Sequence, residues 1–178
     1  MKLTIALSAC ALMLTTAAFA GKELELGENP PAFHVTDVTG PEAGKSLCYR
    51  CRFGNQPVVT IFTRQINDEL ATLVKNVDQV VGQNQGEKMA AFVVLLSDDP
   101  TAHEGELKAF AQKHSITNTP LTVFDDKNGP PSYNLTNADF TVMMWVDSAV
   151  KVNETFNAGQ LSPQAVTQVV EKTDAILN

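Results

Sequence analysis

Cysteine, histidine and tryptophan are scarce in this sequence. Its 178 residues include three cysteines, three histidines and one tryptophan. A structural zinc site needs about four ligands, whereas Cys48 and Cys51 supply two and the histidines are scattered along the chain. Arg52 also stands where a haem-attachment motif has a histidine after its second cysteine. We therefore expect no metal and no organic cofactor.

An excess of positive charge is absent too. The chain has 13 Lys and Arg against 20 Asp and Glu, a net charge of −7. An acidic domain repels phosphate backbones, so nucleic acid is not an expected partner. After residue 20 there is no apolar run of the ~20 residues that a membrane-spanning helix needs. We therefore expect a soluble mature protein with no membrane span.

The first twenty residues have the pattern of a secretory signal peptide. Lys2 provides the positive start, an apolar stretch follows, and Ala18-Phe19-Ala20 has the small-x-small pattern of a cleavage site. Cleavage after Ala20 would leave residues 21–178 as one periplasmic or secreted domain. An alternative is a lipoprotein, because Leu7-Ser8-Ala9-Cys10 resembles a lipobox that would place a lipid on Cys10. Only about seven apolar residues precede Cys10, which is short for that signal.

Hydrophobic periodicity predicts alternating strands and helices in the rest of the chain. We expect strands over residues 32–38, 58–62, 89–96, 120–124, 140–146 and 150–156. We expect helices over residues 67–81, 99–114 and 162–176. A β-α-β unit requires parallel strands with a right-handed crossover, whereas the hairpin around residues 147–149 adds antiparallel strands. The pattern therefore predicts an α/β three-layer sandwich with a mixed central sheet flanked by helices.

Three segments resemble the redoxin branch of the thioredoxin-like superfamily. Residues 26–33 (LGENPPAF) are similar to the lead-in of peroxiredoxins and periplasmic thioredoxin-like proteins, and residues 57–62 (PVVTIF) to their first core strand. Residues 116–124 (ITNTPLTVF) resemble the segment that holds a cis-proline beside the active site. The resemblance implies a thioredoxin-like fold from about Leu26 onwards. It also implies a cis Thr119–Pro120 bond, with both residues contacting an extended thiol substrate.

The sequence departs from this family at the reactive cysteine. In the family that cysteine begins the helix after the first core strand, where the helix dipole lowers the pKa of a thiol. Residues 63–70 (TRQINDEL) fill this place and contain no sulfur. Standard thioredoxin and peroxiredoxin chemistry therefore lack their nucleophile here. Arg64 could retain a binding role at this place, the alternative being that it belongs to a solvated helix start.

A C-x-x-C pair, Cys48 and Cys51, instead precedes the core strand. Such a pair is a candidate for thiol–disulfide exchange with a thiol- or disulfide-bearing protein, with either cysteine attacking and with Arg50 and Arg52 stabilising a thiolate. A bridge across so small a loop gains little entropy by closure, which favours chemistry over a structural role. Against chemistry, no helix start is predicted at the pair. The alternative is a non-catalytic module that binds a protein through its Pro120 surface, with a structural disulfide.

Overall fold

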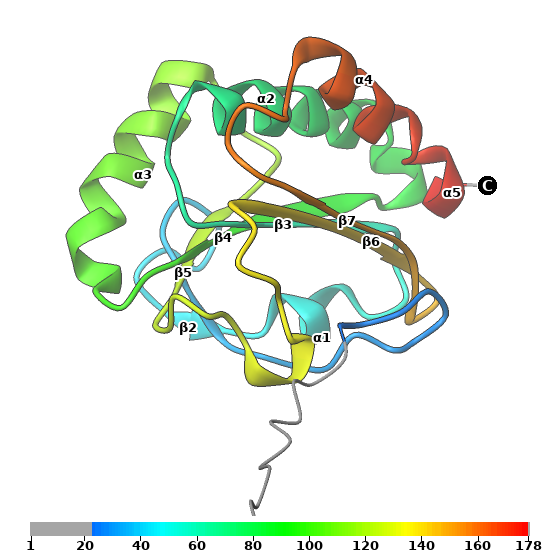
Figure 1. The fold of residues 1–178 in the computed structure, drawn as a ribbon, viewed down its shortest axis with the longest axis horizontal. Helices are drawn as coiled ribbons and strands as arrows, with labels where there is room; N and C mark the ends of the chain where they lie inside the picture. The colour runs from blue at the N-terminus through cyan, green and yellow to red at the C-terminus, as the bar shows by residue number, and fades with distance from the viewer. Residues whose placement is uncertain (1–22, 178) are drawn as a thin grey trace, which may run out of the picture.

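The computed structural model describes residues 23–177 (Figure 1). The predicted signal peptide and Cys10 lie outside the described residues. The strands form one seven-stranded sheet in the order β2-β1-β5-β4-β3-β6-β7. Their bounds are β1 Val35–Asp37, β2 Ser46–Leu47, β3 Val58–Thr63, β4 Ala90–Leu96, β5 Leu121–Phe124, β6 Phe140–Val146 and β7 Ala149–Phe156.

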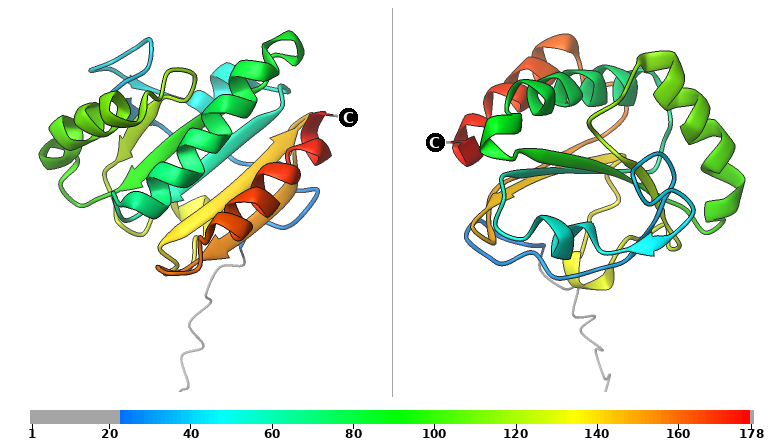
Figure 2. Two further views of the ribbon diagram at one scale, coloured as in Figure 1. Left: turned by 90° about the horizontal axis from the view of Figure 1, so that it is seen from above. Right: turned by 180° about the vertical axis from the view of Figure 1, so that it is seen from behind.

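Helices cover both faces of this sheet unequally (Figure 2). One face carries α2 Asp68–Gln83, α3 Pro100–His114, α4 Pro163–Glu171 and α5 Asp174–Leu177. The opposite face carries the short helix α1 Tyr49–Phe53, the 3-10 turn η2 Pro131–Tyr133 and the N-terminal lead-in. A further 3-10 turn, η1 Gln85–Glu87, lies between α2 and β4 in the chain. No helix within residues 23–177 is both long enough and apolar enough to cross a membrane.

Strand pairing confirms the predicted mixed sheet. β3, β4 and β5 are parallel, whereas β6 runs antiparallel to β3, and β1 runs antiparallel to β5. The strand β3 is buried along its whole length, as expected for an apolar strand covered on both faces. The predicted α/β three-layer sandwich is therefore confirmed.

Each face of the sheet has its own hydrophobic core. The core under α2, α3 and α4 is mainly aliphatic, and the amphipathic stripe of α2 contributes Leu73 and Val77. The core under α1 is rich in aromatic side chains, including Phe33, Tyr49, Phe62, Phe92, Tyr133 and Trp145. Helix starts follow the predicted capping residues: the side chain of Asn67 accepts from Leu70 N at 2.9 Å, and Asp99 and Ser162 cap α3 and α4.

The structure corrects two expectations about the segments between these elements. The edge strand expected over residues 32–38 is shorter, and the segment after it contains β2 and α1, which were not predicted. The cis bond expected at Thr119–Pro120 is wrong, because residues 23–177 contain no cis peptide bond. The trans form of an X–Pro bond is lower in free energy by about 0.5–1 kcal/mol.

A buried carboxylate on α2 holds the loop that leads into β5. Asp78 accepts hydrogen bonds from Thr117 N at 3.2 Å and from Asn118 N at 2.7 Å. Replacing Asp78 by Ala leaves these partly buried donors without their charged acceptor, so we expect the free energy of unfolding to fall by about 2–3 kcal/mol. Urea denaturation measures this change. Asp68→Ala, an exposed first-turn control on the same helix, should cost less than about 1 kcal/mol, and equal losses would contradict the assignment.

Candidate functional site

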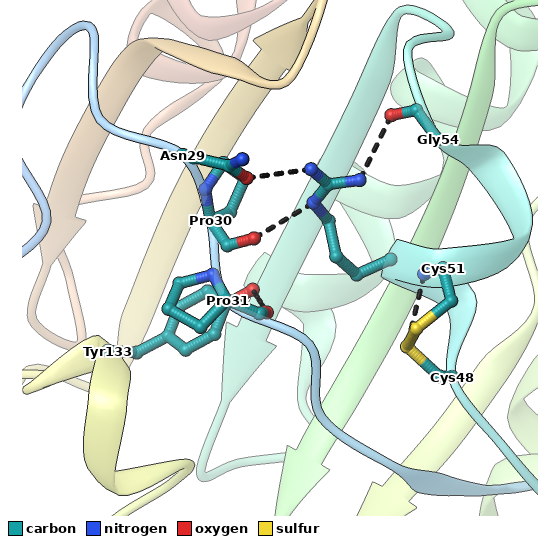
Figure 3. Close-up of a disulfide and its surroundings, with 8 residues drawn as sticks. Asn29, Pro30, Pro31, Cys48, Cys51, Gly54 and Tyr133 are labelled. Atoms are coloured by element: carbon teal, nitrogen blue, oxygen red, sulfur yellow. Dashed lines mark hydrogen bonds between the residues drawn. A yellow bond between two sulfur atoms is a disulfide. The ribbon is translucent and has the colours of Figure 1, made fainter.

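The two cysteines form a disulfide at the start of α1 (Figure 3). Their Cα atoms are 5.2 Å apart. Cys48 is the N-cap residue of α1, and its Sγ accepts a hydrogen bond from Cys51 N at 3.0 Å. The expectation that no helix begins at the pair is therefore wrong. A helix of five residues is too short to produce the apolar periodicity on which that expectation relied.

Tyr49, between the cysteines, fastens α1 to the sheet. Its side chain is 1% exposed, and its ring stacks on Phe92 of β4 with ring centroids 5.2 Å apart. Its hydroxyl donates to Asp37 Oδ2 at 2.9 Å. Burial, together with the Asp37 carboxylate, raises the pKa of Tyr49 well above its ordinary value. The phenol is therefore a permanent donor to Asp37 at physiological pH.

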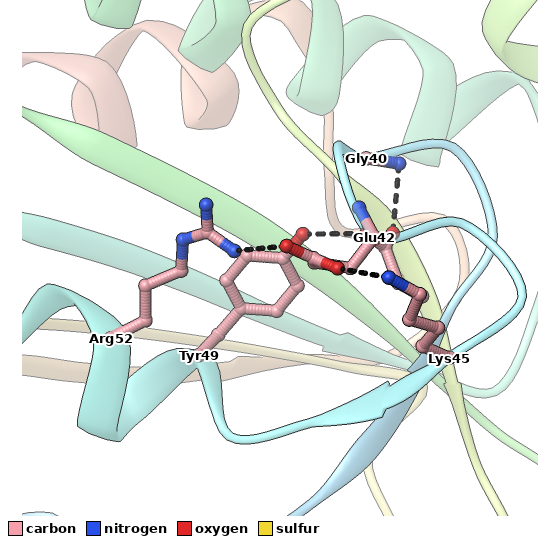
Figure 4. Close-up of polar contacts among 6 residues, drawn as sticks. Gly40, Glu42, Lys45, Tyr49 and Arg52 are labelled. Atoms are coloured by element: carbon pink, nitrogen blue, oxygen red, sulfur yellow. Dashed lines mark hydrogen bonds and ion pairs between the residues drawn. The ribbon is translucent and has the colours of Figure 1, made fainter.

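Asp37 in turn organises the loop between β1 and β2. Its carboxylate is fully buried and also accepts from Gly40 N at 2.8 Å and from Glu42 N at 2.9 Å. A buried carboxylate needs such donors because removing a charge from water is costly. The cysteine-bearing helix and the loop over residues 37–45 are thus fastened to one buried group (Figure 4).

Arg50, the other residue between the cysteines, fastens α1 to two distant segments. Its guanidinium donates to Pro30 O at 2.9 Å and Asn29 Oδ1 at 2.7 Å in the lead-in. It also donates to Gly54 O at 3.1 Å and to Ser148 Oγ at 3.0 Å in the β6–β7 turn. Only 9% of this residue is exposed. Its hydrogen bonds therefore give Arg50 a structural role, beside the sequence-based prediction that it stabilises a thiolate.

Arg52 is the exposed cation nearest the pair in sequence. Its side chain is 44% exposed, and its Nη1 lies 3.5 Å from Glu42 Oε1. Lys45 Nζ lies 2.9 Å from the other Glu42 oxygen (Figure 4). Lys45, and to a smaller extent Arg52, lowers the pKa of Glu42. Such exposed ion pairs contribute little to stability, so the contact with Glu42 holds the Arg52 side chain only weakly.

The two cysteine residues differ in exposure to solvent. Cys51 is exposed, whereas Cys48 is only partly exposed. The helix α1, at whose start they lie, is on the face of the sheet opposite to α2 (Figure 1). The pair therefore does not reach the start of α2, where redoxins carry their reactive cysteine.

A polar network occupies that place instead. Arg64 Nε donates to Lys127 O at 3.0 Å, and its Nη1 donates to Ala138 O. Gln65 Nε2 donates to the carboxylate of Asp139, and Arg64 N donates to Asp139 O at 3.1 Å. Burial lowers the pKa of Arg64. These bonds join the end of β3 to the beginning of β6, but the buried Arg64 Nη2 has no hydrogen-bond partner among the described residues.

Pro120 lies away from this network. Leu121, which follows Pro120, pairs with Val93 of β4. Val93 in turn pairs with Ile61 in the middle of β3, so Pro120 does not lie beside the end of β3. The strand that begins beside the end of β3 is β6, where Phe140 pairs with Thr63. The structure therefore does not bring Pro120 and Arg64 together. Thr119 and Pro120 instead line a hollow of about 420 Å³ with Thr39, Gly40, Pro41 and residues 116–118.

The buried partners of α1 were missed by the sequence analysis. In the sequence, Asp37 looks like an ordinary polar residue of an alternating strand. Its hydrogen-bond partner Tyr49 is twelve residues away, and no neighbouring residue predicts that contact. The Asp37-x-x-Gly40 spacing is a turn signal, and it is the one local hint of a carboxylate turned towards its own loop.

Solved structures resemble this chain in fold at low sequence identity. One is assigned as the thiol:disulfide interchange protein DsbE from Chlorobium tepidum, with a TM-score of 0.68 and 13% identity, covering 88% of this chain and 100% of that one. Another is assigned as a protein disulfide isomerase from Bacteroides thetaiotaomicron, with a TM-score of 0.65, 15% identity and coverage of 86% and 91%. A peroxiredoxin-like protein from Aquifex aeolicus has a TM-score of 0.60, 16% identity and coverage of 86% and 90%. No protein-family model and no curated protein matches the sequence.

Removing the Tyr49 hydroxyl tests how α1 is fastened. Tyr49→Phe keeps the ring stacking but removes a donor from a buried carboxylate, so we expect a loss of about 1.5–3 kcal/mol in the free energy of unfolding. Tyr133→Phe is the matched control, because its hydroxyl donates to the neutral carbonyl of Pro31 at 2.8 Å; it should cost about 1 kcal/mol. Chemical denaturation of both variants with the disulfide intact gives the comparison. A smaller loss for Tyr49→Phe than for Tyr133→Phe would refute the anchor.

Proposed function

Because the chain has the thioredoxin-like fold that it shares with redoxin-type proteins, we propose that it exchanges thiols and disulfides with partner proteins through Cys48 and Cys51. The observation that carries this proposal is the double anchoring of α1. Tyr49 and Arg50 hold the helix by hydrogen bonds that do not involve sulfur. The disulfide is therefore not needed to keep α1 in place and is free to open and close.

Exchange begins at Cys51, the more exposed of the two cysteine residues. A partner thiolate attacks Cys51 Sγ, forms a mixed disulfide with it, and expels Cys48 as a thiolate. A second partner thiolate then attacks the partner's own sulfur in the mixed disulfide and releases Cys51. The partner dithiol loses two electrons and becomes a disulfide, whereas the Cys48–Cys51 disulfide gains two electrons and, after protonation from solvent, becomes a dithiol. The reverse sequence reduces a partner disulfide.

Local groups support a thiolate at this position. The Cys51 N–H that now donates to Cys48 Sγ would donate more strongly to a charged sulfur. Arg52 supplies an exposed positive charge on the same helix. A cation and open helix N–H groups both lower the pKa of a thiol, which makes it a better leaving group.

The redox potential of the pair decides between exchange and a structural bridge. We expect a value within roughly −120 to −270 mV, the range of working dithiol couples, measured by thiol alkylation after equilibration in glutathione buffers. We also expect Cys48→Ser and Cys51→Ser each to abolish disulfide reduction in an insulin assay. His103→Ala, an exposed change on α3, is the control and should leave the rate unchanged.

A potential below about −300 mV would mark a structural bridge. The non-catalytic alternative would then stand, with partner binding at the hollow beside Thr119 and Pro120. In that case Pro120→Ala, and not the cysteine changes, would weaken capture of a partner protein.

We further propose that the protein works outside the cytoplasm, in the periplasm or as a secreted protein. Support comes from the signal-like residues 1–20 together with a pair of cysteines at disulfide distance, since disulfides persist in oxidising compartments.

The mass of the exported chain tests this localisation. Expression of the full sequence in a bacterium should give a mature protein that begins at Gly21, as read by intact-mass spectrometry of the periplasmic fraction. A lipid-modified chain that begins at Cys10 would support the lipoprotein alternative. An uncleaved cytoplasmic chain would contradict export.

A further inference from the structure

Two adjoining hollows lie between the loop over residues 37–45 and the segment over residues 115–120. The larger has a volume of about 640 Å³ and the smaller a volume of about 420 Å³. Thr39, Ile116 and Thr117 line both hollows, which therefore form one furrow. Binding sites for small ligands have volumes of about 300–1,000 Å³ and combine apolar walls with a few polar groups. The furrow has the size of such a site.

Thr119 brings an unused hydroxyl to the smaller hollow. Only 3% of this residue is exposed, and its Oγ1 has no hydrogen-bond partner among the described residues. Within residues 23–177, its N–H and the carbonyl oxygens of residues 117–119 make no backbone–backbone hydrogen bond either. Buried polar groups in folded proteins nearly always have partners, because leaving water without one costs free energy. The unpaired groups gathered beside this hollow therefore point to a missing partner.

The larger hollow is apolar by comparison. The buried side chains of Val38 and Ile116 line it, together with Ala43 and Ala111. Among residues 23–177, no acidic residue lines either hollow. Covering apolar surface stabilises a complex by roughly 25 cal/mol per Å². The larger hollow therefore favours an aliphatic side chain, whereas the smaller one favours groups that form hydrogen bonds.

A buried carboxylate fixes each wall of the furrow. Asp37 holds the loop between β1 and β2, and Asp78 holds the loop that leads into β5. Leu121 N donates to Thr39 Oγ1 at 2.8 Å and so joins the two walls. A site whose walls are already fixed loses little conformational freedom when a ligand binds, and more of the contact energy is kept as affinity.

We propose that the furrow binds a short peptide segment of a partner protein. One aliphatic side chain of the peptide occupies the larger hollow. A main-chain carbonyl of the peptide accepts from Thr119, and a main-chain N–H donates to a carbonyl oxygen of residues 117–119. A peptide fits because it carries an apolar side chain between two amide groups. This inference goes beyond the proposed exchange, since the furrow binds whether or not Cys48 and Cys51 react.

Blocked amino acids test the furrow with the smallest ligands that have these features. N-acetyl-leucine N-methylamide carries an aliphatic side chain between two amides, and N-acetyl-glycine N-methylamide lacks the side chain. Titration of each into the isotope-labelled protein is followed by NMR. The leucine compound should shift the amide signals of residues 115–119 and bind about fivefold more tightly than the glycine compound. Isobutanol, which has the side chain without the amides, should bind more weakly than the leucine compound.

Thr119→Val separates binding from stability. Valine has the shape of threonine without the hydroxyl, and this hydroxyl has no partner among the described residues. We therefore expect an unchanged or higher midpoint of urea denaturation, but about fivefold weaker binding of the leucine compound. Thr141→Val is the matched control, because its hydroxyl is also buried and unpartnered but its residue lines neither hollow. It should leave binding unchanged.

Three results would overturn the proposal. Equal affinity for the leucine and glycine compounds would remove the side-chain site, and isobutanol binding as tightly as the leucine compound would indicate a site for apolar molecules. A lower denaturation midpoint for Thr119→Val, with unchanged binding, would mean that the hydroxyl has a structural water as its partner.

Titration of the Cys48→Ser, Cys51→Ser double variant keeps the two proposals apart. Unchanged binding of the leucine compound would support a furrow that works independently of the sulfurs. A redox potential typical of a structural bridge, with binding intact, would overturn the exchange and keep the furrow. A working potential without binding would do the reverse.

Discussion

The hydrogen bond from the Tyr49 phenol to the buried Asp37 carboxylate fixes the position of α1 on the sheet. Asp37 needs this donor because its charge is fully buried, and the loop over residues 37–45 is wrapped around the same carboxylate. The packing leaves no room for a side chain at Gly40, where a Cβ atom would lie 2.4 Å from the Tyr49 hydroxyl. The cysteine pair, the ion pair of Arg52 with Glu42 and the short strand β2 all depend on this one arrangement.

Sequence patterns were reliable where an element is long and packs on one consistent face. The strands β3 and β4 and the helices α2 and α3 each carry a run or period of apolar residues, and their predicted positions are confirmed. The elements β2 and α1 were missed because two and five residues carry no period, and their positions follow from contacts with Asp37 and the aromatic core. The segment around Pro120 was misassigned because its local resemblance to the family does not show which strand begins beside the end of β3. The pairing of Phe140 with Thr63 shows that this strand is β6.

The chain thus has a thioredoxin-like sheet in which polar side chains fill the place after the first core strand. Arg64 donates there to Lys127 O, and Gln65 donates to the carboxylate of Asp139. The cysteines belong to the start of α1, whose Tyr49 packs in an aromatic core that includes Phe92 on the other face of the sheet. The helix α1 has only five residues and no long apolar stripe to pack on the sheet. The hydrogen bonds of Tyr49 and Arg50 hold it in position instead, and with it the two cysteines.

The hydrogen bonds of Arg50 also join segments that are synthesised far apart in time. They join α1 to Asn29, 21 residues earlier in the chain, and to Ser148, 98 residues later. Contacts between residues so far apart form slowly, because the intervening chain must first lose its conformational freedom. During synthesis the β6–β7 turn follows α1 by almost a hundred residues, so Arg50 stays without this partner until the domain is nearly complete. The environment of the cysteine pair is therefore among the last parts of the molecule to mature.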